Sequence, residues 1–263
     1  MANKVLLILA DGLRPDSIYP ADPAFAEFFK SGIYSFQAQT TYPTSTTTCH
    51  MSLFHSVGPE RHGTDSNIFV PFACPVKGLI ENLNAAGKTT GFLFTWLPLR
   101  DIFTPRSGLD YGWFVKQTEE NYTSLPFKVT DAAIQMIDEY APDFVFLYLG
   151  SPDAYGHSVG WMTPEYISGV KDVWSCIQKV CKALPDEYSV IVTADHGGHD
   201  QTHGTDMPED MLIPVVVKGN GLPVGRELSQ CDIRDVAPTV MELMGLAPDS
   251  DWDGTSILKQ IQD

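Results

Sequence analysis

The sequence is poor in basic residues. Among its 263 residues, 17 Lys and Arg stand against 33 Asp and Glu, so the formal net charge is -16. No run of Lys or Arg follows a predicted helix, and we therefore expect neither a nucleic acid polymer nor an anionic membrane as a partner. The same charge would repel an anionic substrate, unless bound cations reverse the field where acidic side chains converge.

Cysteines and long apolar runs are also scarce. The five cysteines form no C-x-x-C pair, which argues against a disulfide scaffold and favours a reducing cytoplasm. The apolar run Val5–Ala10 is too short for a signal sequence or a membrane span, and it predicts a buried first strand. With 43% hydrophobic residues and no internal repeat, residues 1–263 are expected to form a single domain, and the oligomeric state stays open.

Apolar runs alternate with helical patterns along the chain. The runs expected to be strands are Val5–Ala10, Thr90–Thr95, Phe144–Leu149, Ser189–Thr193 and Ile213–Val217. The segments expected to be helices are Val76–Ala86, Val129–Tyr140, Pro164–Leu184 and Ile233–Met244. Strands alternating with helices predict a three-layer α/β/α sandwich with a largely parallel central sheet. Residues 97–126 show little periodicity, so they are a candidate small cap or substrate loop.

Acidic and histidine residues follow three of the predicted strands. One strand end supplies Asp195, His196, His199 and His203 within nine residues. Carboxylates and imidazoles are the ligands of zinc and related divalent ions. Because ligands bind at the carboxyl edge of open α/β sheets, this segment predicts a metal site there. A His-rich surface loop is the alternative interpretation.

Two further strand ends carry carboxylates. Asp153 and His157 are four residues apart, which places both side chains on one face if a helical turn follows the strand. Taken alone, this pair could also be an N-cap Asp with an exposed His nearby. Asp11 leaves a buried strand directly, where a carboxylate is costly unless it binds a cation or several donors.

A hydroxyl-rich segment, residues 42–52, precedes an apolar helical stretch. A hydroxyl at a helix N-terminus meets the positive end of the helix dipole, which suits a phosphate group. The segment could equally be a helix N-cap only. Chemistry alone does not choose among the hydroxyls of Thr44, Ser45, Thr46, Thr47 and Thr48.

In this order, these segments resemble the alkaline phosphatase superfamily, and most closely its nucleotide pyrophosphatase/phosphodiesterase branch, over nearly the whole chain. Residues 42–50 and 58–63 are similar to the branch's P-T-x-T-x-x-x-H and x-P-E-x-H-G patterns, whose second Thr is the nucleophile. The resemblance implies that Thr46 is the nucleophile. It also implies that Asn67 holds a phosphoryl oxygen, together with the backbone N–H of Thr47.

The resemblance further implies two divalent metal ions. Residues 152–157 look like the family's P-D-x-x-G-H motif, which makes Asp153 and His157 ligands of one metal, with His203 preferred over His199 as the third. The ligands implied for the second metal are Asp11, Thr46, Asp195 and His196. Zinc is the expected metal, and the oxygen and nitrogen ligand set is also compatible with manganese or iron. His50, His55 and His62 are expected to be structural.

The implied function is hydrolysis of a small-molecule phosphate ester by a two-metal phosphodiesterase or nucleotide pyrophosphatase. The alternatives are a phosphonoacetate hydrolase-like enzyme, a phosphomonoesterase or phosphotransferase of the same superfamily, and a metal-stabilised binding protein without turnover. A sulfatase is disfavoured because the chain has no C-x-P-S-R segment. The chain departs from the branch where Thr47 and Thr48 replace the usual aromatic residue and Pro after the nucleophile.

Overall fold

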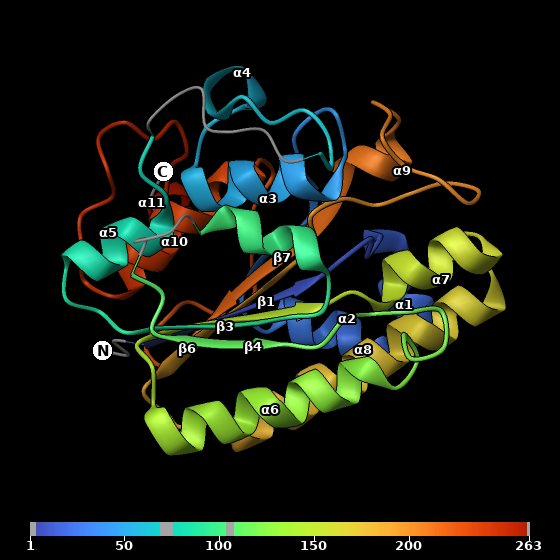
Figure 1. Cartoon of the computed structure of the whole chain (residues 1–263), viewed down its shortest axis with the longest axis horizontal. Coiled ribbons are helices and arrows are strands. Elements are labelled where there is room, and N and C mark those ends of the chain that lie inside the picture. Colours follow the sequence, from blue (N-terminus) through green and yellow to red (C-terminus); the bar gives the residue numbers. More distant parts are fainter. Residues whose placement is uncertain (1–3, 69–75, 104–107, 262–263) are drawn as a thin grey trace.

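The computed structural model describes residues 4–68, 76–103 and 108–261, which are arranged in three layers (Figure 1). Its central sheet has the strand order β4-β3-β5-β1-β6-β7-β2-β8. The strand bounds are β1 Lys4–Ala10, β2 Ile33–Gln39, β3 Thr90–Phe94, β4 Tyr111–Phe114, β5 Phe144–Leu149, β6 Tyr188–Thr193, β7 Leu212–Lys218 and β8 Arg226–Glu227. Neighbouring strands are parallel except where β7 pairs with β6 and with β2. The predicted, largely parallel α/β/α sandwich is confirmed.

Helices cover both faces of this sheet. Their bounds are α1 Pro15–Ala21, α2 Pro23–Lys30, α3 Thr46–His55, α4 Pro59–His62, α5 Leu79–Ala85, α6 Leu125–Tyr140, α7 Ser151–Val159, α8 Pro164–Ala183, α9 Pro208–Met211, α10 Val236–Leu243 and α11 Ile257–Gln260. Two short 3-10 helices are η1 Leu97–Ile102 and η2 Ile233–Asp235. In Figure 1, α1, α2, α6 and α8 lie on one face, and α3, α5 and α10 lie on the other. None of the helices in the described ranges is long and apolar enough to cross a lipid bilayer.

All five predicted strands are present, and the differences lie elsewhere. β2 was missed because its burial alternates along the strand, whereas the prediction relied on continuous apolar runs. The predicted helix Ile233–Met244 divides into η2 and α10. The helix expected from Val129 begins earlier, at Leu125, because a Pro in the first turn removes no helical hydrogen bond.

The segment 97–126, expected to be a cap or substrate loop, contains η1 and β4. β4 pairs in parallel with β3 and so forms one edge of the central sheet. Residues 104–107, within this segment, lie outside the described residues. Part of the segment therefore extends the sheet itself.

The central strands β5, β1 and β6 are buried along nearly their whole length. Leu6, Leu7, Ile8 and Leu9 of β1 are all 0% exposed, and burying each such side chain stabilises the fold by about 1.5–3 kcal/mol. The three strands run parallel, so their carboxyl ends meet at one edge of the sheet. This rigid framework positions the side chains that follow each strand.

Candidate active site

The acidic residues singled out in the sequence converge at this edge. Asp11 follows β1 directly, and Asp195 lies two residues after the end of β6. Asp153 is the third residue of α7, the helix that follows β5, and the N-cap of that helix is Gly150. The alternative that Asp153 only caps a helix is therefore wrong.

One group of side chains contains Asp11, Asp195, His196 and Thr46, all of them buried. His196 Nε2 lies 3.4 Å from Asp11 Oδ1, 3.4 Å from Asp195 Oδ2 and 3.2 Å from Thr46 Oγ1. Tetrahedral coordination at bond lengths of about 2.0–2.1 Å places neighbouring ligand atoms about 3.3 Å apart. The spacing and the donor types of this group therefore fit a divalent metal ion.

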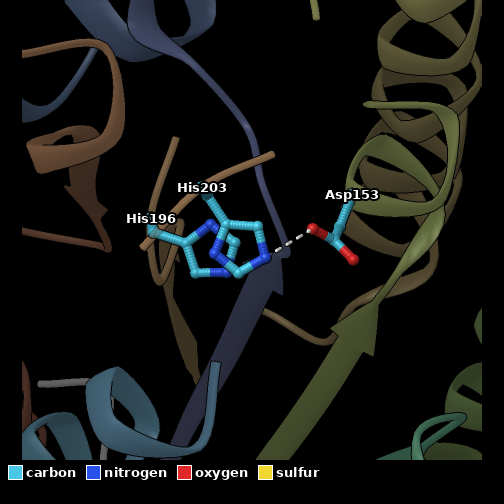
Figure 2. Close-up of side chains that lie close together, drawn as sticks. All are labelled: Asp153, His196 and His203. Carbon is cyan, nitrogen blue, oxygen red and sulfur yellow. Dashed lines mark ion pairs between the residues drawn. The ribbon is translucent and has the colours of Figure 1, made fainter. Parts of the chain in front are cut away.

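A second group contains Asp153, His157 and His203. Asp153 Oδ1 lies 3.4 Å from His157 Nε2 and 3.6 Å from His203 Nε2, and the two Nε2 atoms are 3.2 Å apart. Figure 2 shows Asp153 facing His203, whose ring stacks on that of His196 with 3.9 Å between centroids. The stacked pair brings His196 to the boundary between the two groups, and Asp153, His196 and His203 together can also hold an ion.

Backbone carbonyls orient the imidazole rings of both groups. The Nδ1 atoms of His157, His196 and His203 lie 3.0, 2.8 and 2.6 Å from the carbonyl oxygens of Gln201, Gly197 and Thr44, respectively. A carbonyl only accepts, so each Nδ1 carries the proton and each Nε2 presents a lone pair. The facing Nε2 lone pairs of His157 and His203 would repel each other unless a cation lies between them.

Three carboxylate oxygens at the site have no hydrogen-bond partner among the described residues: Asp11 Oδ1, Asp153 Oδ1 and Asp195 Oδ2. Burial, followed by repulsion from neighbouring carboxylates, raises the pKa of Asp11 well above its usual range. Burial and the charge of Asp153 raise the pKa of Asp195 to about 8. Burial also lowers the pKa of His203 to about 4. Burying unpaired carboxylates lowers the stability of the fold, and a bound cation would offset this loss of free energy.

The hydroxyl-rich segment forms the start of α3. Thr46 is the first residue of the helix, and its hydroxyl contacts the first group of candidate ligands. Thr44 Oγ1 instead donates to the Thr205 carbonyl, 2.9 Å away. Ser45 occupies the N-cap position, but its hydroxyl donates to Asn67 Oδ1, 2.8 Å away, and does not cap the helix. Of these three hydroxyls, that of Thr46 lies at the candidate metal site.

Asn67 lies beside this helix start. Its Oδ1 accepts from the Thr47 N–H at 2.9 Å, which leaves the Nδ2 donors on the other side of the amide. The Thr47 N–H was expected to bind a phosphoryl oxygen, but in this structure it donates to Asn67 Oδ1. The side-chain hydroxyls of Thr47 and Thr48 are buried and have no partner within the described ranges.

The remaining histidines have other surroundings. His199, the alternative to His203, pairs with Asp210 through Nδ1 and Oδ1 atoms 2.8 Å apart and is absent from both candidate ligand groups. His50, His55 and His62 are buried. His50 Nδ1 lies 2.7 Å from the Thr46 carbonyl oxygen, so a residue expected to be structural also contacts the first residue of α3.

Two residues that support the site were not assigned this role from the sequence. Trp161 is buried, its ring packs edge-on against those of His157 and His203, and its indole N–H donates to the carbonyl of the residue after Asp11. Tyr148 of β5 donates its hydroxyl hydrogen to Asp11 Oδ2. A Tyr within a fully apolar strand was a usable signal, because a buried hydroxyl needs a partner.

Comparisons with known proteins agree with the predicted family. Curated relatives include a 2,3-bisphosphoglycerate-independent phosphoglycerate mutase from Staphylococcus haemolyticus, 32% identical over 140 residues, which are 51% of this chain and 26% of the mutase. The chain thus spans about a quarter of the length of the curated relatives it matches.

Solved structures show the same fold. Murine ectonucleotide pyrophosphatase / phosphodiesterase 5, as an inactive variant in complex with AMP, superposes with a TM-score of 0.81 at 17% identity, over 99% of both chains. A 2-O GAG sulfatase superposes with a TM-score of 0.78 at 14% identity, over 100% of this chain and 74% of the sulfatase. These similarities confirm the predicted alkaline phosphatase-like fold.

A family model described as type I phosphodiesterase / nucleotide pyrophosphatase matches residues 5–76 and 79–217. That match includes both groups of candidate metal ligands, Thr46 and Asn67. The chain therefore belongs to the type I phosphodiesterase / nucleotide pyrophosphatase family.

Proposed function

We propose that this protein is a metal-dependent phosphoric ester hydrolase that uses Thr46 as its nucleophile and acts on a small phosphodiester or nucleotide pyrophosphate. One observation carries the proposal: Thr46 Oγ1 lies 3.2 Å from His196 Nε2, within a buried group of two carboxylates and one imidazole. A purely structural metal site would close its coordination with protein ligands and would need no hydroxyl beside it. Membership of the family supports the same activity.

Two divalent ions are the proposed cofactors. Asp11, Asp195 and His196 would hold one ion beside Thr46, and Asp153, His157 and His203 would hold the other. Zinc is proposed because of the ligand types and spacing, and the same oxygen and nitrogen atoms accept manganese or iron. When bound, the ions would supply positive charge that lowers the pKa of the nucleophile and offsets charge on the phosphoryl group.

Thr46 is proposed to attack phosphorus in line with the leaving group. Its hydroxyl stands at the N-terminus of α3, where the helix dipole favours negative charge. The Thr46 oxygen forms a bond to phosphorus as the bond between phosphorus and one ester oxygen breaks. The leaving group departs as an alcohol and takes up the proton of the Thr46 hydroxyl. Water then cleaves the phosphothreonine and releases the phosphomonoester. Two inversions predict net retention at phosphorus.

Asn67 is proposed to bind a phosphoryl oxygen through its Nδ2 donors. Its Oδ1 is held by the Thr47 N–H and the Ser45 hydroxyl, so the amide is fixed before substrate arrives. A donor already oriented toward developing charge lowers the barrier without reorganising. In this proposal the Asn67 amide, and not the Thr47 N–H, stabilises the phosphoryl group, because the Thr47 N–H already donates to Asn67.

A nucleotide diester is the first substrate to examine, because the structurally similar phosphodiesterase 5 was solved with AMP. The curated relatives favour one other activity. They are phosphoglycerate mutases, so transfer of a phosphoryl group from a phosphomonoester through the same threonine is the second candidate. The two differ in whether phosphorus carries one or two ester groups.

The test compares hydrolysis of bis-p-nitrophenyl phosphate and p-nitrophenyl phosphate by protein reconstituted with zinc or manganese. Thr46→Val is expected to reduce turnover by about 10³-fold or more, while metal content stays near the wild-type value. Thr48→Val is the matched control, since it removes a nearby buried hydroxyl that has no partner in the described residues.

Preference for the diester, lost only in Thr46→Val, would support the phosphodiesterase. Preference for the monoester would favour the phosphotransferase or phosphomonoesterase. Equal turnover by Thr46→Val and wild type would refute the nucleophile assignment, and bound metal with no turnover of either ester would favour a phosphonate substrate or a non-catalytic protein.

A further inference from the structure

The two carboxylate oxygens of Asp11 have different partners. Oδ2 accepts a hydrogen bond from the Tyr148 hydroxyl. Oδ1 has no hydrogen-bond partner among the residues described and lies 3.4 Å from His196 Nε2. Tyr148 thus engages one carboxylate oxygen of Asp11 and leaves the other beside His196 Nε2.

The Tyr148 hydroxyl is held on a rigid part of the fold. Tyr148 is 2% exposed and belongs to β5, which pairs with β1 along its whole length. The backbone N–H of Asp11 donates to the Leu149 carbonyl at 3.0 Å, so the strand that carries Tyr148 also fixes the backbone of Asp11. The Tyr148 ring also packs against that of His50, with 5.8 Å between centroids.

A carboxylate needs such support because the terminal torsion of Asp is only weakly restricted. A single hydrogen bond to Oδ2 selects one orientation of the carboxylate plane and therefore fixes the direction of the lone pairs on Oδ1. Groups that orient metal ligands in this way typically contribute 10- to 100-fold to metal affinity, as a general order of magnitude.

We propose that Tyr148 is a positioning residue for metal binding: its hydroxyl orients Asp11 so that Oδ1 faces the ion held with Asp195 and His196. The proposal rests on the proposed function, because it assumes that these residues bind a metal. It concerns the group that contains Asp11, because among the described residues the Tyr148 hydroxyl donates a hydrogen bond to Asp11 and to no member of the second group. Asp153 acts on that hydroxyl through its charge only.

Tyr148→Phe removes only the hydroxyl, and Tyr188→Phe is its matched control. Tyr188 is also buried in a central strand, β6, and its hydroxyl also donates to an oxygen, the Pro142 carbonyl. Tyr188 pairs with Lys4 at the opposite end of β1 from Asp11. The two variants therefore lose the same chemical group from similar surroundings, one beside the candidate site and one far from it.

The experiment titrates the metal-stripped full chain with zinc in competition with a chromophoric chelator. Wild type and Tyr188→Phe are each expected to bind two zinc ions, and the affinity of each site should be the same in the two proteins. Tyr148→Phe is expected to bind one of the two about 10- to 100-fold more weakly and the other unchanged. Excess zinc should restore most of the turnover of Tyr148→Phe. It would not do so if the substitution lowered turnover by unfolding the protein.

Unchanged affinity at both sites in Tyr148→Phe would overturn the inference while leaving the proposed function intact. Equal weakening at both sites, or equal weakening in Tyr188→Phe, would also overturn it, because the effect would then be general destabilisation. Wild-type protein that binds neither zinc nor manganese would overturn the proposed function itself, and the inference with it.

Discussion

Replacing His62 by Asn should remove one defined contribution to the acid sensitivity of this fold. His62 is 1% exposed, and burial, followed by the charge of His55, lowers its pKa to about 4 from 6.5. Its Nδ1 accepts from the Thr64 N–H at 3.1 Å, so the proton sits on Nε2, which faces Ser52 Oγ at 3.0 Å. A second proton on Nδ1 would oppose the Thr64 N–H directly.

The direction in which pH changes the stability follows from proton linkage. Between pH 6.5 and about 4 the unfolded chain binds a proton at His62 and the folded chain does not, so the free energy of unfolding falls as the pH falls through this window. At pH 4.5 the loss from this one side chain is about 2–3 kcal/mol, at 1.36 kcal/mol for each unit of pKa difference. Above pH 6.5 the contribution of His62 is complete.

The assay is urea denaturation of the metal-free protein at pH 7.5 and at pH 4.5, followed by circular dichroism. His62→Asn should be less stable than wild type at pH 7.5 by about 1–3 kcal/mol, because the buried Ser52 hydroxyl loses its partner. At pH 4.5 that deficit should shrink by about 2–3 kcal/mol. Taking the difference between the two proteins cancels titrations they share, including those of the candidate metal ligands. A deficit of the same size at both pH values would refute the reasoning.

Two further substitutions test the support of the candidate site. Gly198→Ala should lower the free energy of unfolding by about 1–3 kcal/mol, because a Cβ there would lie 2.2 Å from the Trp161 ring; an unchanged urea midpoint would contradict this packing. Asp210→Asn should cost about 1–3 kcal/mol and weaken zinc binding, since the buried carboxylate accepts from His199 and from both donors of Thr205 near the loop that carries His203. Calorimetry of Asp210→Asn with and without zinc would measure the loss of stability and the weaker zinc binding. A melting temperature equal to that of wild type under both conditions would show that Asp210 does not support the site.

The Gly198→Ala experiment has a control glycine in the edge strand β4. Gly112 of β4 would place a Cβ 3.8 Å from its nearest neighbour, Leu109, which is an ordinary contact. Gly112→Ala should therefore leave the urea midpoint close to that of wild type.

Much of the fold was determined by local sequence pattern. The strands β1, β3, β5, β6 and β7 are buried on both faces, so each produces an apolar run that is visible without any tertiary information. β2 escaped notice because only one of its faces is buried, and β8 is two residues long. Family membership was also recognisable, because the motifs consist of short contiguous segments.

Part of the candidate site was likewise predictable from the sequence, and part was not. Residue type and position after a strand were enough to single out Asp11, Asp153 and Asp195, since parallel strands deliver their carboxyl ends to one edge. The choice of His203 over His199 came from the family resemblance, and no local pattern separates the two histidines. The folded chain places His203 beside Asp153 and pairs His199 with Asp210.

Only the tertiary structure decided which atoms meet. The contact of Tyr148 with Asp11 joins residues 137 positions apart, and that of Thr46 with His196 joins residues 150 apart. Local patterning carries no information about such pairs, because their distance depends on how the whole sheet and its covering helices pack. The sequence by itself therefore determined the family, the buried strands of the sheet and the kinds of candidate ligand, whereas packing decided which hydroxyl faces the candidate ligands and which side chains contact them.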